Sequence, residues 1–179
     1  VEKDIENALN FLKHRDGDSW FLERFFSGEA RHLMESALAG DEREAAVRKY
    51  VEGYFSEHGA EMRSGLEAAK TDWKKVEDEY FRIVDILFKN RPWPAGDYRG
   101  IASIFGMYPR WVEEKIFFFP YAHRKPGYAN RVIGHEMLHF MFFDYIHERY
   151  GLEGESKMKG KDADHVWKVS ESFNVVIEE

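Results

Sequence analysis

The apolar run from Val132 to Phe143 contains two histidines and a glutamate in the pattern His135-Glu136-x-x-His139, an HExxH motif. In an α-helix, side chains four residues apart share a face, so both imidazoles point the same way and Glu136 lies beside them. This spacing predicts that both imidazoles bind one Zn²⁺ and that Glu136 acts on a water molecule as general base. Two core histidines without a metal are the alternative, but burying polar groups without partners is costly.

Composition restricts the remaining ligands and the partners. The 179 residues include no cysteine, which excludes disulfides, thiolate metal sites and a cysteine nucleophile, so every metal ligand must be His, Asp or Glu. A net charge of −7 argues against a general nucleic-acid or anionic-membrane binder, because both need a basic face. No apolar run reaches the roughly 18 residues of a membrane span, so we expect no membrane association and, by default, a cytoplasmic protein.

Helical periodicity without proline extends from Val1 to about Asn90. Charged and glycine-containing stretches divide it into short amphipathic helices that must pack on something else. We therefore divide the chain into a helical N-terminal segment, residues 1–58, and a core, residues 59–179. The predicted short helices start near Ile5, near Trp20, at about Glu29 and at Gly40.

The longest predicted helix covers about Ala60 to Lys89, where apolar residues recur at alternating steps of four and three. Such a heptad seam is typical of a dimerising coiled coil. A seam of only a few heptads is better explained by a long helix that packs against its own domain. We expect a backing helix, with a dimer through this seam as the alternative. The seam consists of Met62, Leu66, Ala69, Trp73, Val76, Tyr80, Ile83 and Leu87.

After two prolines the pattern changes to short segments rich in Ile, Phe and Tyr, which predict two strands joined through residues 108–110. The second is apolar on both faces and suits an inner strand, whereas the first is mixed and suits an edge. The HExxH helix and a last helix follow, so the predicted fold class is α+β and mostly helical. The strands cover about Arg99 to Met107 and Lys115 to Tyr121, and the helices cover Tyr128 to Tyr150, before Gly151, and Asp162 or Asp164 to Ile177.

A catalytic zinc site usually has three protein ligands and one position for water, so a third ligand must come from outside the motif. Glu171, His165 and the pair Asp162 and Asp164 are the candidates. Glu171 is favoured because its helix is apolar on most sides, where an unpaired carboxylate would be costly. Helix capping alone explains the aspartates. His165 is the rival, either as a ligand or as a hydrogen-bond donor beside the metal.

The HExxH motif followed by the helix that contains Glu171 resembles the gluzincin group of zincin metallopeptidases, such as thermolysin. A long helix, strands, an HExxH helix, a loop and a Glu-bearing helix follow each other as in the compact form of that fold. The resemblance covers roughly residues 60–179 and implies a zincin-like core with a small sheet, a long backing helix and a C-terminal Glu-bearing helix. It also implies that Asn174 orients a ligand imidazole.

Two other zincin groups fit less well. A metzincin would have Gly and His where this chain has Phe142 and Tyr145, which excludes that class. A weaker resemblance to SprT-like proteases would assign His165 and Trp167 to the third histidine and the aromatic residue of that family, although their spacing here is shorter.

The motif and the resemblance together predict a zinc metallopeptidase with Zn²⁺ on His135, His139 and Glu171 and with Glu136 as general base. A peptide or protein substrate would pair with the edge strand at residues 101–107. The alternatives are a metal-stabilised interaction module and a latent enzyme whose segment 1–58 covers the cleft. The oxyanion donor is predicted to be His165, chosen from a set that also includes Tyr121, His123, Tyr128 and Tyr145.

Overall fold

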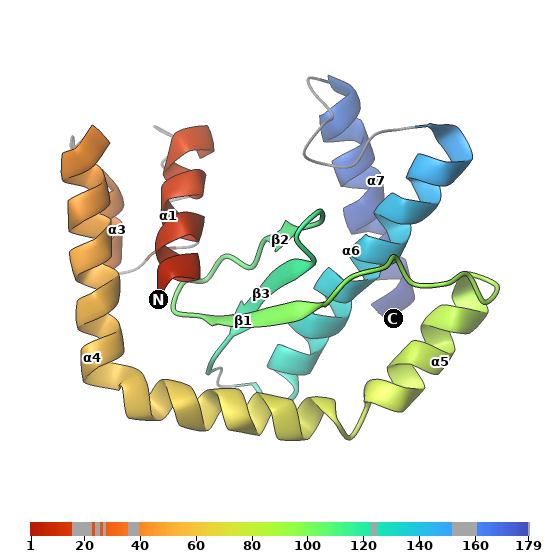
Figure 1. Cartoon of the computed structure of the whole chain (residues 1–179), viewed down its shortest axis with the longest axis horizontal. Coiled ribbons are helices and arrows are strands. Elements are labelled where there is room, and N and C mark those ends of the chain that lie inside the picture. The colour runs from red at the N-terminus through yellow and green to blue at the C-terminus, as the bar shows by residue number, and fades with distance from the viewer. Residues whose placement is uncertain are drawn as a thin grey trace.

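The computed structural model describes residues 1–15, 23, 26, 28–35, 40–122, 125–151 and 161–178. It confirms the predicted α+β class, because helices surround a small mixed sheet (Figure 1). Most of the helix predicted near Trp20 lies outside the described residues. The described elements are α1 (Glu2–Arg15), α3 (Gly28–Glu35), α4 (Gly40–Trp73), α5 (Glu77–Leu87), β1 (Arg99–Ser103), β2 (Arg110–Trp111), β3 (Ile116–Pro120), α6 (Tyr128–Tyr150) and α7 (Lys161–Glu178).

The sheet has the strand order β1-β3-β2, with β1 parallel and β2 antiparallel to β3. The predictions of an inner second strand and an edge first strand are confirmed, and β3 is buried along its whole length. The predicted extent of the first strand is wrong, because β1 ends at Ser103 and the predicted connection contains β2. Parallel strands need a crossover rather than a tight turn, so the chain leaves the sheet after Ser103 and returns along β2.

The predicted helix over residues 60–89 is wrong at its start and in its middle, because α4 begins at Gly40 and the helix is interrupted between Trp73 and Glu77. At the break, the Trp73 indole donates a hydrogen bond to Glu77, at 3.1 Å. The seam therefore does not continue as one stripe, and Val76 and Ile83 are 40% and 44% exposed. Figure 1 shows that α4 bends, that its C-terminal part runs beneath the sheet and the start of α6 in this view, and that α5 turns upward after the break. Dimerisation through this seam stays a prediction.

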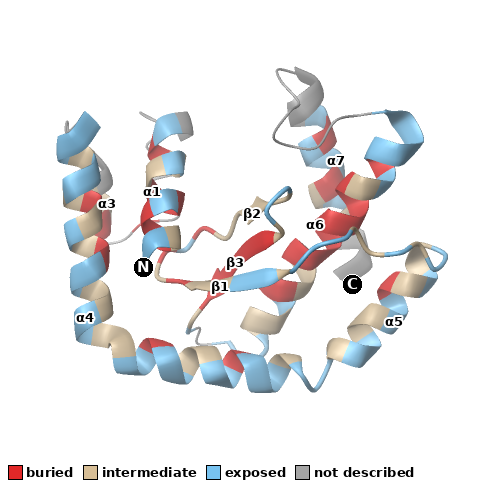
Figure 2. Ribbon diagram, in the orientation of Figure 1, coloured by how far each residue is buried: buried red, intermediate tan, exposed pale blue. Residues whose placement is uncertain are grey.

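Buried residues concentrate on β3 and α6, with a second cluster around α1 and α4 (Figure 2). Phe105 and Met107, which follow β1, pack in this second cluster together with Ile5 and Val47. The boundary predicted near residue 58 lies inside α4, and the division into two segments stays a prediction. No described helix combines the length and apolar character needed to cross a membrane.

At Gly65, helix α4 lies close to the chain that follows β3, because a Cβ there would lie 2.0 Å from the carbonyl oxygen of Tyr121. Alanine in a helix interior is normally about 1 kcal/mol more stable than glycine. We nevertheless expect Gly65→Ala to lower the free energy of unfolding by about 1–3 kcal/mol, because the backbone of residue 121 must move. Gly53→Ala is the matched control in α4. Its new Cβ meets nothing within 4 Å, so this substitution should raise the free energy of unfolding. Urea unfolding that shows equal stabilisation by both variants would contradict this close approach.

Candidate metal centre

Helix α6 has the bounds predicted from the sequence. It starts at Tyr128 and ends at Tyr150, and Gly151 stops it in the left-handed region, with φ of 65°. The N–H of Gly151 donates to the carbonyl of His147 at 2.9 Å, as expected for a C-terminal cap. One face of α6 packs on β3 through residues such as Met137, and the two histidines, each two positions from Met137, face a different neighbour, α7.

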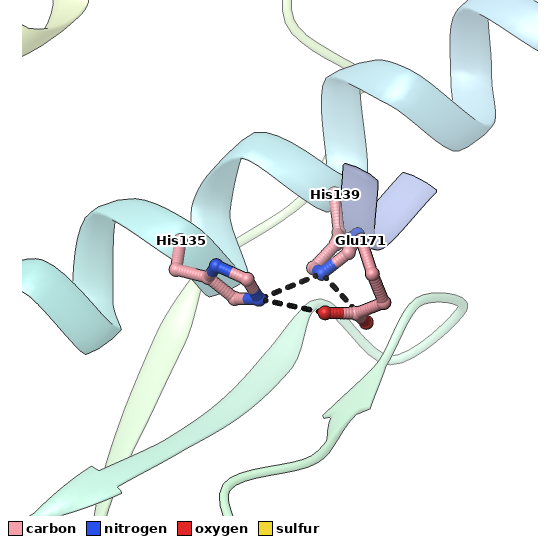
Figure 3. Close-up of side chains that lie close together, drawn as sticks. All are labelled: His135, His139 and Glu171. Carbon is pink, nitrogen blue, oxygen red and sulfur yellow. Dashed lines mark hydrogen bonds and ion pairs between the residues drawn. The ribbon is translucent and has the colours of Figure 1, made fainter. Parts of the chain in front are cut away.

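The structure brings together the three residues predicted as metal ligands, as Figure 3 shows. The Nε2 atoms of His135 and His139 are 3.2 Å apart. The two carboxylate oxygens of Glu171, from α7, lie 3.2 Å from His135 Nε2 and 3.4 Å from His139 Nε2. Zinc bonds of about 2.0–2.1 Å at tetrahedral angles place neighbouring ligand atoms roughly 3.3 Å apart. The donor set and its spacing therefore fit a zinc ion.

The protonation states also fit a cation. Burial lowers the pKa of His139 to about 3, so its imidazole is neutral at pH 7, the form that binds metal. Burial alone would raise the pKa of Glu171, but its hydrogen bonds to His135 and His139 and the charge of Arg110 outweigh this effect and lower the pKa below its ordinary value. A neutral imidazole and an ionised carboxylate thus meet at one point.

Two neighbouring elements hold the turn of α6 that contains the first histidine. The hydroxyl of Tyr80, from α5, donates to the carbonyl of Gly134 at 2.8 Å. The side-chain amide of Asn174, from α7, donates to the carbonyl of His135 at 3.0 Å and is fully buried. Asn174 was predicted to orient a ligand imidazole, whereas its observed bond is to the backbone. It positions the histidine through the helix rather than through the ring.

Glu136 lies beside the three candidate ligands and outside their group. Its Oε1 is 4.0 Å from His135 Nε2, and its side chain is only 7% exposed. Burial raises the pKa of Glu136 to about 7, against the lowering effect of the charge on Arg110. A carboxyl group with a pKa near neutrality can both accept and release a proton at physiological pH.

Sequence reasoning missed Arg110, which comes from β2. Its Nη1 atom lies 3.4 Å from Oε2 of Glu136 and 3.3 Å from Oε1 of Glu171, and its side chain is 7% exposed. The sequence places this arginine in what looks like a connection between strands, and no local pattern marks it. Only the antiparallel pairing of β2 with β3 carries it to α6 and α7.

The structure does not bring His165 to the site. His165 is exposed on α7 and is not part of the metal-binding group found among the described residues. It precedes Glu171 by six residues, so its side chain is displaced from that of Glu171 by about 9 Å along the helix and by roughly a third of a turn around it. Of the other candidate oxyanion donors, the Tyr121 hydroxyl hydrogen-bonds Tyr54 at 2.7 Å, Tyr145 is 40% exposed, Tyr128 begins α6, and His123 lies outside the described residues. The side chains of Asp162 and Asp164, the other candidate ligands, also lie outside the described residues.

No family model, curated protein or solved structure matches this chain. The candidate function therefore depends on the residues of the site and on their geometry.

Proposed function

We propose that the chain is a zinc-dependent metallopeptidase of gluzincin-like type. The observation that supports it best is the convergence of His135, His139 and Glu171, with 3.2 to 3.4 Å between their nearest ligand atoms. Two imidazoles and a carboxylate without a thiolate are a common donor set of catalytic zinc. The carboxylate of Glu136 stands next to this group without belonging to it, as a general base must.

Different residues would have different roles in hydrolysis. When bound, zinc would supply Lewis acidity to a water molecule and to the substrate carbonyl. Glu136 takes a proton from the attacking water and later delivers it to the nitrogen of the leaving amine. Tyr80 and Asn174 fix the turn of α6 from which the first ligand projects. Burial raises the pKa of Glu136 to about 7, so the same carboxylate can accept the first proton and release it in the second step.

An extended peptide would lie along β2 rather than along β1. The sequence suggested the edge at residues 101–107, but β1 lies on the far side of β3 from β2. Strand β2 sends Arg110 into the site and is itself an edge strand of the sheet. Backbone pairing along this edge gives affinity with little sequence selectivity, so we expect a broad range of peptide substrates.

Zinc removal tests the proposal. We expect the purified chain to bind one equivalent of zinc and to cleave casein or a quenched fluorescent peptide mixture. A chelator should stop cleavage and added Zn²⁺ should restore it, with zinc followed by mass spectrometry. A zinc-loaded chain that cleaves nothing would instead support a metal-stabilised interaction module.

A further inference from the structure

We propose that Arg110 is a catalytic residue that binds the oxygen of the scissile carbonyl as this oxygen becomes negative. The inference rests on the proposed function, since it assigns a role within peptide hydrolysis. Its basis is that a guanidinium only 7% exposed reaches from β2 to both carboxylates of the site, Glu136 and Glu171.

The guanidinium of Arg110 is held from three sides. Its Nη1 lies 3.4 Å from Oε2 of Glu136 on α6 and 3.3 Å from Oε1 of Glu171 on α7. Its Cζ also stands 5.5 Å from the ring centre of Phe143, within cation–π range. A donor fixed in this way needs no reorganisation when charge develops nearby, and this preorganisation makes oxyanion donors effective.

The reaction places a negative charge on the carbonyl oxygen, and the guanidinium of Arg110 can balance this charge. As the water oxygen bonds to the carbonyl carbon, the π electron pair moves onto the carbonyl oxygen, and Glu136 takes the proton. When the tetrahedral intermediate collapses, the C=O bond re-forms, the C–N bond breaks, and Glu136 passes the proton to the nitrogen of the leaving amine. The negative oxygen thus forms near the carboxylates of Glu136 and Glu171, which would repel it. Arg110 contacts both carboxylates and supplies the compensating positive charge, and its five N–H donors allow several acceptors at once.

The competing explanation is that Arg110 only holds Glu136 and Glu171 in place. Arg110→Met removes the charge and keeps much of the side-chain length, and Arg110→Lys keeps the charge but loses the planar fork. Arg91→Met is the matched control, because Arg91 also binds carboxylates of α6, at Asp144 and Glu148, away from the site.

Four quantities separate the two roles: kcat, KM, the zinc dissociation constant from chelator competition, and the affinity of the zinc-loaded protein for a phosphinic peptide, an anionic mimic of the tetrahedral state. For Arg110→Met we expect kcat to fall about 10²–10³-fold, with KM and zinc affinity changed less than about threefold. Affinity for the phosphinic peptide should fall in parallel with kcat. Arg110→Lys should be intermediate, and Arg91→Met should match the parent protein.

Unchanged kcat in Arg110→Met would overturn the inference. So would a loss of activity that saturating zinc restores, because that result would mean that Arg110 only supports the metal site. If the parent protein cleaves no peptide, the proposed function fails and the role of Arg110 fails with it. If the parent protein cleaves, Glu136→Gln does not, and Arg110→Met cleaves normally, only the role of Arg110 is refuted.

Discussion

Glu136→Gln is expected to abolish peptide cleavage and to leave zinc binding intact. Glutamine keeps the size of the side chain but cannot accept a proton from water, and loss of a positioned general base costs about 10²–10⁴-fold in rate. Zinc should stay bound, because the ligand group consists of His135, His139 and Glu171. Steady-state kinetics together with zinc content by mass spectrometry measure both quantities.

Glu148→Gln is the control for this substitution. Glu148 lies on the same helix, pairs with Arg91, and its side chain is 70% exposed. We expect parent-like activity from it. Folding should survive in Glu136→Gln as well, because an amide removes the cost of burying a charge and Arg110 keeps Glu171 as a partner. A folded, zinc-loaded Glu136→Gln variant with full activity would refute Glu136 as the base.

The features predicted well from the sequence are those set within one helix. The bounds of α6 follow from its apolar periodicity and from Gly151, whose positive φ stops the helix. The shared face of His135 and His139 follows from their spacing of four residues. Glu171 could be predicted as well, because a carboxylate among apolar residues needs a partner, and the structure shows two imidazoles beside it.

The features that depend on distant parts of the chain were not predictable. The helix is interrupted after Trp73, and the heptad pattern of the sequence gives no sign of this interruption. The parallel pairing of β1 with β3 depends on the path of the chain after Ser103. There the chain leaves the sheet, and Phe105 is buried in the cluster around α1. Arg110 reaches the site only through that topology, and His165 lies on α7 outside the group formed by His135, His139 and Glu171.

Glu171→Gln is expected to weaken zinc binding about 10²–10³-fold. Structural zinc sites with four ligands are worth about 10–16 kcal/mol, so one ligand contributes about 2.5–4 kcal/mol. Glutamine removes the negative charge and offers a weaker donor in the same space. His165→Ala should leave the zinc affinity unchanged, because His165 is exposed outside the group. Chelator competition measures both affinities.

The same pair of variants should differ in stability, because the ligands come from two helices. Zinc held by His135 and His139 on α6 and by Glu171 on α7 would join these helices, and a ligand that binds only the folded state raises the unfolding temperature. We therefore expect added zinc to raise the unfolding temperature of the parent protein and of His165→Ala, and to raise it much less in Glu171→Gln. If His165→Ala loses this stabilisation and Glu171→Gln keeps it, the third ligand is His165, and α7 must rotate to bind the metal.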